Sequence, residues 1–198
     1  DRSQIKEADE KGYFFSSANS INWGRLAPQI VYYISAYCDL VAKGDIEYGE
    51  KVDVCVPTGN FGNIFAAYIA KRMGLPVRKL VCASNKNNIL TDFLSTGVYD
   101  RNRSFYTTMS PSMDILISSN LERLLYLVAG SKATAEYMKQ LSETGRYQVE
   151  KEVFYKIKED FEGYYCDEEN TSQTVSSIYR EYGYLSDTHS AVAINAAL

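Results

Sequence analysis

Apolar residues occur along this chain as short continuous runs alternating with stripes at helical spacing. One run covers residues 52–56, a helical segment follows from Ile64 to Gly74, and a second run at 77–83 begins just after Pro76. Two apolar strands joined by a single helix form a crossover connection, which makes the strands parallel and buries both faces of their sheet. We therefore predict an α/β fold, with an open, twisted, mainly parallel sheet flanked by helices.

Helical spacing accounts for most of the other apolar positions. From Leu26 they recur every three or four residues as far as Val41, which predicts a helix with one face toward the core and Pro28 in its first turn. The other predicted elements are helices at 88–96, 121–128, 131–141, 149–158 and 168–182, a strand at 161–166, and a final helical segment at 189–198.

Composition narrows the class of protein. The chain has 198 residues with 45% hydrophobic content, which suits one globular domain with a substantial core. Its net charge of -4 is spread without a basic block, so we expect no nucleic-acid partner and no anionic membrane surface. Because neither a signal peptide nor a membrane-spanning run is found, we expect a cytoplasmic protein that acts on a small molecule.

The four cysteines are Cys38, Cys55, Cys82 and Cys166. They lie far apart and form no CxxC pair or His-Cys cluster, so the sequence supports neither a metal site nor a disulfide framework. We expect buried, reduced thiols, which suit a reducing compartment.

A glycine-rich loop connects the first predicted strand to the helix that follows it. Gly59 and Gly62 remove two Cβ atoms from the path of an anion, and the helix start offers free N–H groups and a positive dipole end. The loop lacks the ending of a triphosphate P-loop and the third glycine of a dinucleotide fingerprint, so neither ATP nor NAD is supported. The pattern favours a phosphate group, although such turns also pack a strand against a helix without any ligand.

Three motifs occur in order along the chain: Ser17–Leu26 (SANSINWGRL), Pro57–Asn63 (PTGNFGN) and Ser186–Ala193 (SDTHSAVA). Together they resemble threonine synthase, over nearly the whole chain. The resemblance implies a pyridoxal-phosphate (PLP) enzyme of the tryptophan-synthase-β-like fold, PLP fold type II. It also implies a lyase of threonine biosynthesis, which converts O-phospho-L-homoserine and water to L-threonine and phosphate.

The resemblance implies two phosphate sites. The backbone amides of the glycine loop would bind the cofactor phosphate, through Gly59, Asn60, Phe61, Gly62 and Asn63. The substrate phosphate, which is the leaving group, would be held by Asn19, Ser20 and Arg25, with the Asn60 side chain as a candidate fourth contact. Arg25 brings a permanent charge and a forked donor geometry. A surface salt bridge is the alternative for Arg25 when it is considered alone.

Ser190 matches the position whose hydroxyl forms a hydrogen bond with the pyridine nitrogen of the cofactor. A neutral partner leaves that nitrogen largely unprotonated and favours elimination and replacement chemistry. A helix N-cap is an equally compatible role for Ser190. His189 is the only histidine, and we assign it no catalytic role.

One expected feature of the family is missing. The lysine that forms the Schiff base should precede the Asn-Ser motif in a Ser/Phe-x-Lys-Asp setting, and the chain has no such segment. We therefore assign no catalytic residue. Because the chain begins at Asp1 and ends within a helical pattern, we expect it to be a fragment of a longer protein. Because the lysine segment would lie upstream, we expect residues 1–198 to be the C-terminal part of a threonine synthase, mostly its large PLP-binding domain. Without the lysine this chain alone should not turn over.

Two alternatives stay open at this point. One is another PLP-dependent β-replacing or dehydrating enzyme, such as a threonine dehydratase or a cysteine synthase; these expel no substrate phosphate, so the Asn19, Ser20 and Arg25 pattern argues against them. The other is a non-catalytic threonine-synthase-like protein that binds phosphate. Nothing in the residues supports an oligomer.

Overall fold

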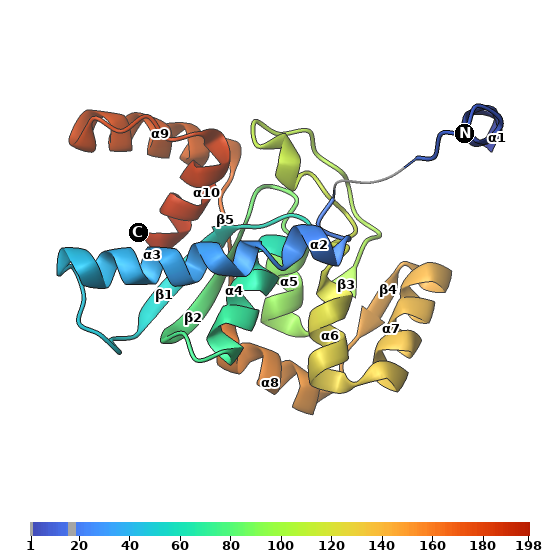
Figure 1. Cartoon of the computed structure of the whole chain (residues 1–198), viewed down its shortest axis with the longest axis horizontal. Helices are drawn as coiled ribbons and strands as arrows, with labels where there is room; N and C mark the ends of the chain where they lie inside the picture. Colours follow the sequence, from blue (N-terminus) through green and yellow to red (C-terminus); the bar gives the residue numbers. More distant parts are fainter. Residues whose placement is uncertain (1, 16–18) are drawn as a thin grey trace.

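The computed structural model describes residues 2–15 and 19–198, and its centre is a parallel sheet of three strands (Figure 1). The strands are β1 (Val52–Pro57), β2 (Val77–Ser84) and β5 (Phe161–Tyr165), in the order β1-β2-β5. Both pairs are parallel, with Val56 opposite Cys82 in the first pair. The predicted α/β fold with a mainly parallel sheet is confirmed.

The two faces of the sheet are covered by different helices. Val54 and Val56 pack into the main core on the side of α4 (Gly62–Arg72). Cys55 points to the other face, where its Sγ donates a hydrogen bond to a main-chain carbonyl of α10 (Thr188–Ala197) at 3.1 Å. This alternation is the period of two that a strand requires.

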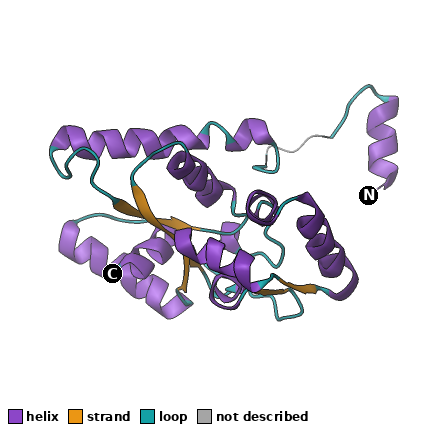
Figure 2. Ribbon diagram, turned by 90° about the horizontal axis from the view of Figure 1, so that it is seen from below, coloured by secondary structure: helices purple, strands orange, loops and turns teal. Residues whose placement is uncertain are grey.

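The chain has further helices, which lie around the sheet and its two covering helices, except for α1, which lies away from the rest at the N-terminal end (Figures 1 and 2). They are α1 (Arg2–Glu10), α2 (Trp23–Leu26), α3 (Gln29–Lys43), α5 (Ile89–Thr96), α6 (Leu121–Ala129), α7 (Ser131–Thr144), α8 (Lys151–Asp160), α9 (Glu168–Tyr182) and the 3-10 turn η1 (Pro111–Met113). Among the described residues, no helix is long and apolar enough to cross a bilayer.

The predicted helix from Leu26 is divided in two. Leu26 ends α2, and Pro28 forms the N-cap of α3 with φ -62°, because proline has no N–H to continue a helix. The stripe is also less buried than predicted: Tyr37 is buried, whereas Ile34 is 37% exposed. The expectation of buried thiols is wrong for Cys38, which is exposed on α3. Burial raises the pKa of the Cys82 thiol to about 12.

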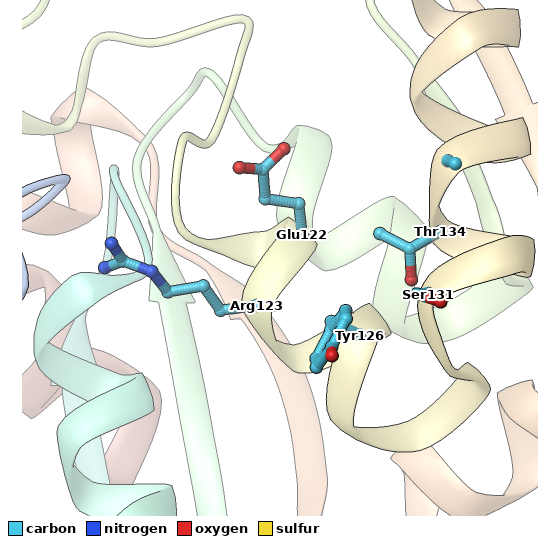
Figure 3. A pocket seen from close by; sticks show the side chains of 6 residues that line it. Glu122, Arg123, Tyr126, Ser131 and Thr134 are labelled. Carbon is cyan, nitrogen blue, oxygen red and sulfur yellow. The ribbon is translucent and has the colours of Figure 1, made fainter.

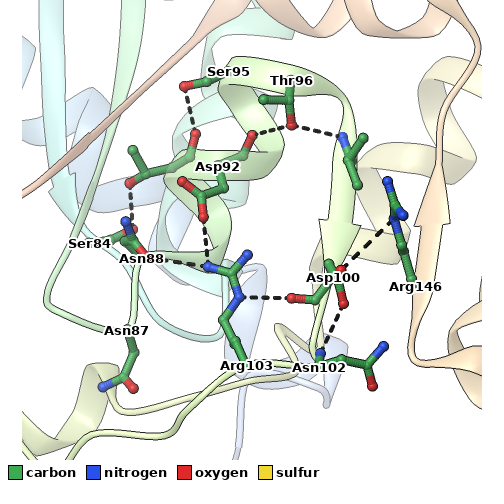
Figure 4. A network of polar contacts seen from close by, with 12 residues as sticks. Ser84, Asn87, Asn88, Asp92, Ser95, Thr96, Asp100, Asn102, Arg103 and Arg146 are labelled. Carbon is green, nitrogen blue, oxygen red and sulfur yellow. Dashed lines mark hydrogen bonds and ion pairs between the residues drawn. The ribbon is translucent and has the colours of Figure 1, made fainter.

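A second, antiparallel sheet was not predicted. It pairs β3 (Val98–Asp100) with β4 (Arg146–Gln148), and each strand is too short to show a period of two. The rings of Tyr99 and Tyr147 stack across it with centroids 5.3 Å apart. Arg103 attaches this sheet to α5, because its guanidinium donates to Asp92 at 2.7 Å and to the Asp100 carbonyl at 2.8 Å (Figure 4).

Parallel strands place their carboxyl ends on one edge of the sheet, where ligands bind in open α/β folds. The glycine loop follows β1 at this edge, and Asn85 follows β2. The segment around η1 and the start of α10 meet here too, since the Ser112 N–H donates to His189 Nε2 at 3.2 Å. The fold therefore brings the second and third sequence motifs to the same edge.

A substitution at Gly163 in β5 would test how closely α5 packs on the sheet. A Cβ at this position would lie 2.9 Å from the Cα of Thr91, which is main chain and cannot rotate away. We expect Gly163→Ala to lower the free energy of unfolding by about 1–3 kcal/mol, measured by urea denaturation. Tyr165→Phe in the same strand is the control and should leave it unchanged; equal values for the two variants would contradict this packing.

Candidate functional site

The glycine loop is held by an unusual backbone conformation at Phe61. Phe61 forms the N-cap of α4 with φ 61° and ψ 0°, and no other described residue except glycine has a positive φ. This left-handed conformation is costly for a bulky residue. The Phe61 ring is 1% exposed and packs on Phe161 with centroids 5.5 Å apart, so burial of the ring holds the strained turn in place.

Both loop glycines are needed for close approach. A Cβ on Gly59 would lie 2.9 Å from the carbonyl oxygen of Ser112. A Cβ on Gly62 would overlap the side chain of Ser20. The loop is therefore packed between the η1 segment on one side and the predicted substrate-phosphate segment on the other.

The N–H groups of the loop are available to a ligand. The backbone amides of residues 59–63 donate no hydrogen bond to any residue that the structure describes. Gly59, Phe61 and Gly62 are nevertheless buried. Buried N–H groups almost always have a partner, and amides at a helix start that lack one form an anion site. The residues present thus fit a phosphate group.

The first predicted motif lies directly against this loop. Its residues Ser17 and Ala18 are outside the described part of the chain. Asn19 accepts hydrogen bonds from the Ser20 hydroxyl at 3.3 Å and from the Ile21 amide at 3.1 Å, which forms a tight turn. Ser20 then lies against Gly62, so the first motif and the glycine loop are in contact.

Arg25 lies in the last turn of α2 and is exposed. It forms no ion pair with any described residue, so the surface salt bridge considered from the sequence is absent from that part of the chain. The Asn60 side chain likewise has no hydrogen-bond partner among the described residues, and the Asn63 side chain accepts one from the Tyr33 hydroxyl. Arg25 and Asn60 thus remain open to a ligand.

Ser190 is at the carboxyl edge of the sheet but does not cap its helix. The N-cap of α10 is Asp187, whose Oδ1 accepts from the amides of His189 at 2.9 Å and Ser190 at 3.1 Å. The alternative of a Ser190 N-cap is therefore wrong. The Ser190 hydroxyl donates to Asp187 Oδ2 at 2.6 Å, and this bond, with the amides, lowers the pKa of the Asp187 carboxyl.

His189 has a structural contact. Its Nε2 accepts from the Ser112 amide at 3.2 Å, so the proton of the neutral ring is on Nδ1, which faces Asp187 Oδ1 at 3.4 Å. The histidine joins α10 to the η1 segment.

A buried network that the sequence did not reveal holds the η1 segment in place. Asn85 Nδ2 donates to Asp114 Oδ1 and to Thr108 Oγ1, both at 2.8 Å. Asn87 Nδ2 donates to the same carboxylate oxygen at 2.9 Å. Asn85 and Asn87 are 1% and 4% exposed, so the network is shielded from water. Because its partners are some twenty to thirty residues apart, no local pattern indicates it.

Polar residues to which the sequence analysis assigns no role contact the loop from the start of α6 and the residues just before it. The Ser118 hydroxyl donates to the Gly59 carbonyl at 2.7 Å, and Asn120 Nδ2 donates to the Asn60 carbonyl at 2.9 Å. Asn120 precedes an apolar stripe, so from sequence it resembles an ordinary helix cap. Nothing in the pattern indicates a contact with a loop sixty residues away.

Two pockets near α6 are not lined by any of the predicted binding residues. One of about 360 Å³ lies between α6 and α7 and is lined by Glu122, Arg123, Tyr126, Ser131, Thr134 and Ala135 (Figure 3). Another of about 220 Å³ is apolar and is lined by Trp23, Phe65, Ile69, Arg123, Tyr126 and Leu127. The candidate site is thus an arrangement of donors at the sheet edge and not either of these pockets.

No protein-family model matches the chain. Curated relatives do match. Threonine synthase-like 1 from Homo sapiens is 52% identical over 187 residues, and threonine synthase from Pseudomonas aeruginosa is 41% identical over 189. These alignments cover 93% and 94% of this chain but only 25% and 39% of the relatives, so the chain spans a quarter to two-fifths of their length.

Solved structures agree with the sequence matches. PLP-bound threonine synthase from Brucella melitensis superposes with a TM-score of 0.88 at 39% identity, over 99% of this chain and 41% of that one. Threonine synthase from yeast gives a TM-score of 0.88 at 36% identity, over 98% and 41%. A PLP-dependent aspartate racemase, at 11% identity and a TM-score of 0.58, shares the fold alone.

The close approach of Gly62 and Ser20 leads to a stability prediction. Gly62 has an ordinary helical conformation, so alanine there meets only a steric obstacle. We expect Gly62→Ala to lower the free energy of unfolding by about 1–3 kcal/mol. Ser20→Gly in the same chain should restore most of the loss, measured by urea denaturation. If the double variant is as unstable as Gly62→Ala, the two segments are not in contact.

The lowered pKa of Asp187 leads to a pH prediction. A depressed carboxyl pKa contributes stability above the unfolded value of about 4, and this contribution is lost as the pH falls through the folded value. Asp187→Asn keeps the cap but cannot accept from the Ser190 hydroxyl. The difference in unfolding free energy between wild type and variant should therefore be larger at about pH 7 than at about pH 2. A difference that does not change with pH would refute this role of the bond.

Proposed function

The chain is a homologue of the threonine synthases over more than nine-tenths of its length, with PLP fold type II, and we propose that it carries the two phosphate sites of such an enzyme. The complete enzyme converts O-phospho-L-homoserine and water to L-threonine and phosphate with PLP, in the cytoplasm. The observation that supports this most is the row of amides at 59–63 that donate to no described residue, with Ser20 packed beside it.

The loop amides bind the phosphate of PLP in this proposal. They belong to Gly59, Asn60, Phe61, Gly62 and Asn63. Fixed N–H dipoles suit a dianion that stays in place throughout a reaction, because they need no reorganisation. When bound, PLP supplies the electron sink for elimination and replacement at the substrate carbons.

The substrate phosphate is held by Asn19, Ser20, Arg25 and the Asn60 side chain. Arg25 supplies the only formal charge of this set, and its exposed position on α2 leaves the guanidinium open to the ligand. Ser190 contacts the pyridine nitrogen. Its hydroxyl proton is directed to Asp187 at 2.6 Å, so the hydroxyl would have to turn to donate to an unprotonated pyridine nitrogen.

The chain does not supply the reactive amine. Lys71 pairs with Asp160 at 2.6 Å, and Lys79 lies 3.6 Å from Glu162. We propose that residues 1–198 are the C-terminal part of the enzyme, mostly the large PLP-binding domain, and that the rest of the relatives' length carries the lysine. This chain alone binds phosphates without turnover. A non-catalytic phosphate-binding protein remains the alternative, and a longer parent protein that lacks such a lysine would establish it.

Binding of phosphates to the full chain tests the proposal. Inorganic phosphate and O-phospho-L-homoserine are added while ¹H–¹⁵N spectra report the amides of residues 59–63. We expect these amides to shift with either ligand, and Arg25→Ala to weaken the binding of phosphohomoserine by roughly tenfold through the loss of a charge-assisted contact. Arg180→Ala is the matched control, since Arg180 is an exposed arginine on α9.

The outcomes separate the parts of the proposal. If no amide of the loop responds to either ligand, the chain is not a phosphate-binding protein. If Arg25→Ala and Arg180→Ala bind phosphohomoserine equally, Arg25 does not hold the substrate. Activity of the longer parent on phosphohomoserine, compared with threonine, distinguishes a synthase from a dehydratase.

A further inference from the structure

Asn120 at the start of α6 contacts both predicted phosphate segments. Its Nδ2 donates to the Asn60 carbonyl at 2.9 Å and to the Ser20 hydroxyl at 3.1 Å. Its main-chain N–H also donates to the Asn60 carbonyl, at 3.1 Å. Asn120 is 0% exposed, so these bonds do not compete with water.

Arg123, one turn further along α6, completes the set. Its Nη1 donates to Asn120 Oδ1 at 2.6 Å and to the Ser20 carbonyl at 3.0 Å, and its Nη2 donates to the Ile21 carbonyl. In Figure 3 the Arg123 guanidinium extends away from Thr134 and α7, while the neighbouring Glu122 points in a different direction. The arginine therefore fixes the Asn120 carboxamide and the 20–21 main chain together.

Helix capping does not explain Asn120. An asparagine at an N-cap ordinarily accepts a hydrogen bond from an amide in the first turn. Asn120 is the N-cap of α6, yet its side chain makes no capping bond. Both ends of the carboxamide are instead used between the loop, Ser20 and Arg123.

Fixing the loop carbonyls also fixes the direction of its amides. In a planar trans peptide, the C=O of one residue and the N–H of the next point in opposite directions. The Ser118 hydroxyl holds the Gly59 carbonyl, which directs the Asn60 N–H away from α6. Asn120 holds the Asn60 carbonyl, which directs the Phe61 N–H in the same way.

We infer that Ser118, Asn120 and Arg123, which we call the α6 clamp, are positioning residues for both phosphate sites. The clamp keeps the Asn60 and Phe61 amides directed at the bound phosphate and holds Ser20 beside Gly62. This inference rests on the proposed function for the identity of the anion. The orientation of the loop itself follows from the contacts alone.

The test uses Asn120→Ala in the full chain, with two readouts. The first is the ¹⁵N order parameters of Asn60 and Phe61 without ligand, which we expect to fall from a rigid value of about 0.85 toward 0.6. The second is the affinity for inorganic phosphate, which we expect to weaken by roughly tenfold. Ser118→Ala is the second variant, and its effect should be larger at the Asn60 amide than at Phe61.

Leu124→Ala is the matched control for a merely structural role. Leu124 is fully buried on the same helix, so this variant lowers stability without removing a contact to the loop carbonyls. We expect its order parameters at residues 60 and 61 and its phosphate affinity to equal those of the wild type. Glu122→Gln, an exposed neighbour, should also change neither quantity.

Each outcome decides one question. If Asn120→Ala and Ser118→Ala both match the wild type in order parameters and phosphate affinity, or if Leu124→Ala alters both quantities as much as they do, the clamp does not position the loop. If the wild-type chain shows no affinity for inorganic phosphate, the proposed function is wrong. The order parameters of the variants still report whether the clamp orients the amides.

Discussion

The packing of the Phe61 ring on Phe161 is the constraint on which the site depends. It links the residue that starts α4 to the first residue of β5, and therefore joins the loop after β1 to the far strand of the sheet. Only a buried ring in this place offsets the cost of a left-handed backbone at a bulky residue. The carboxyl end of β1 sets the edge where the loop lies, and this hydrophobic contact holds the start of α4 against the sheet there.

The local parts of the structure were predictable because their signals are local. The strand, glycine loop and helix at 52–74 follow from apolar runs, two glycines and a helical stripe, and each of these is contained within a dozen residues. The division of the helix at Pro28 was missed because a proline is compatible with a first turn as well as with a break. The β3 and β4 strands were missed because three residues are too few to show the alternation of apolar and polar positions that identifies a strand.

The sequence indicates candidate ligand-binding residues, which stay a prediction, but it does not indicate the contacts that support them. Glycines and an Asn-Ser-x-Asn-x-x-Arg pattern stand out in sequence, because few residue types allow close approach to an anion. Asn120, Asn85 and Asp114 have no such signature, since an asparagine or aspartate near a helix end or turn is common for other reasons. Their roles come from partners twenty to one hundred residues away, which only the fold brings together.

In the proposed function two phosphates lie side by side and repel each other, and each site uses a different kind of hydrogen-bond donor. The loop amides are neutral, most of them belong to buried residues, and two of the loop carbonyls are held by hydrogen bonds, so these amides suit an anion without a mobile counter-charge. Arg25 is charged, exposed and on a short helix, so its attraction is screened by water and salt. Fixed amides suit an anion that stays bound throughout the reaction. A water-exposed arginine suits an anion that leaves after the reaction. In the proposed function, this difference favours retention of the cofactor phosphate at the loop and release of the substrate phosphate at Arg25.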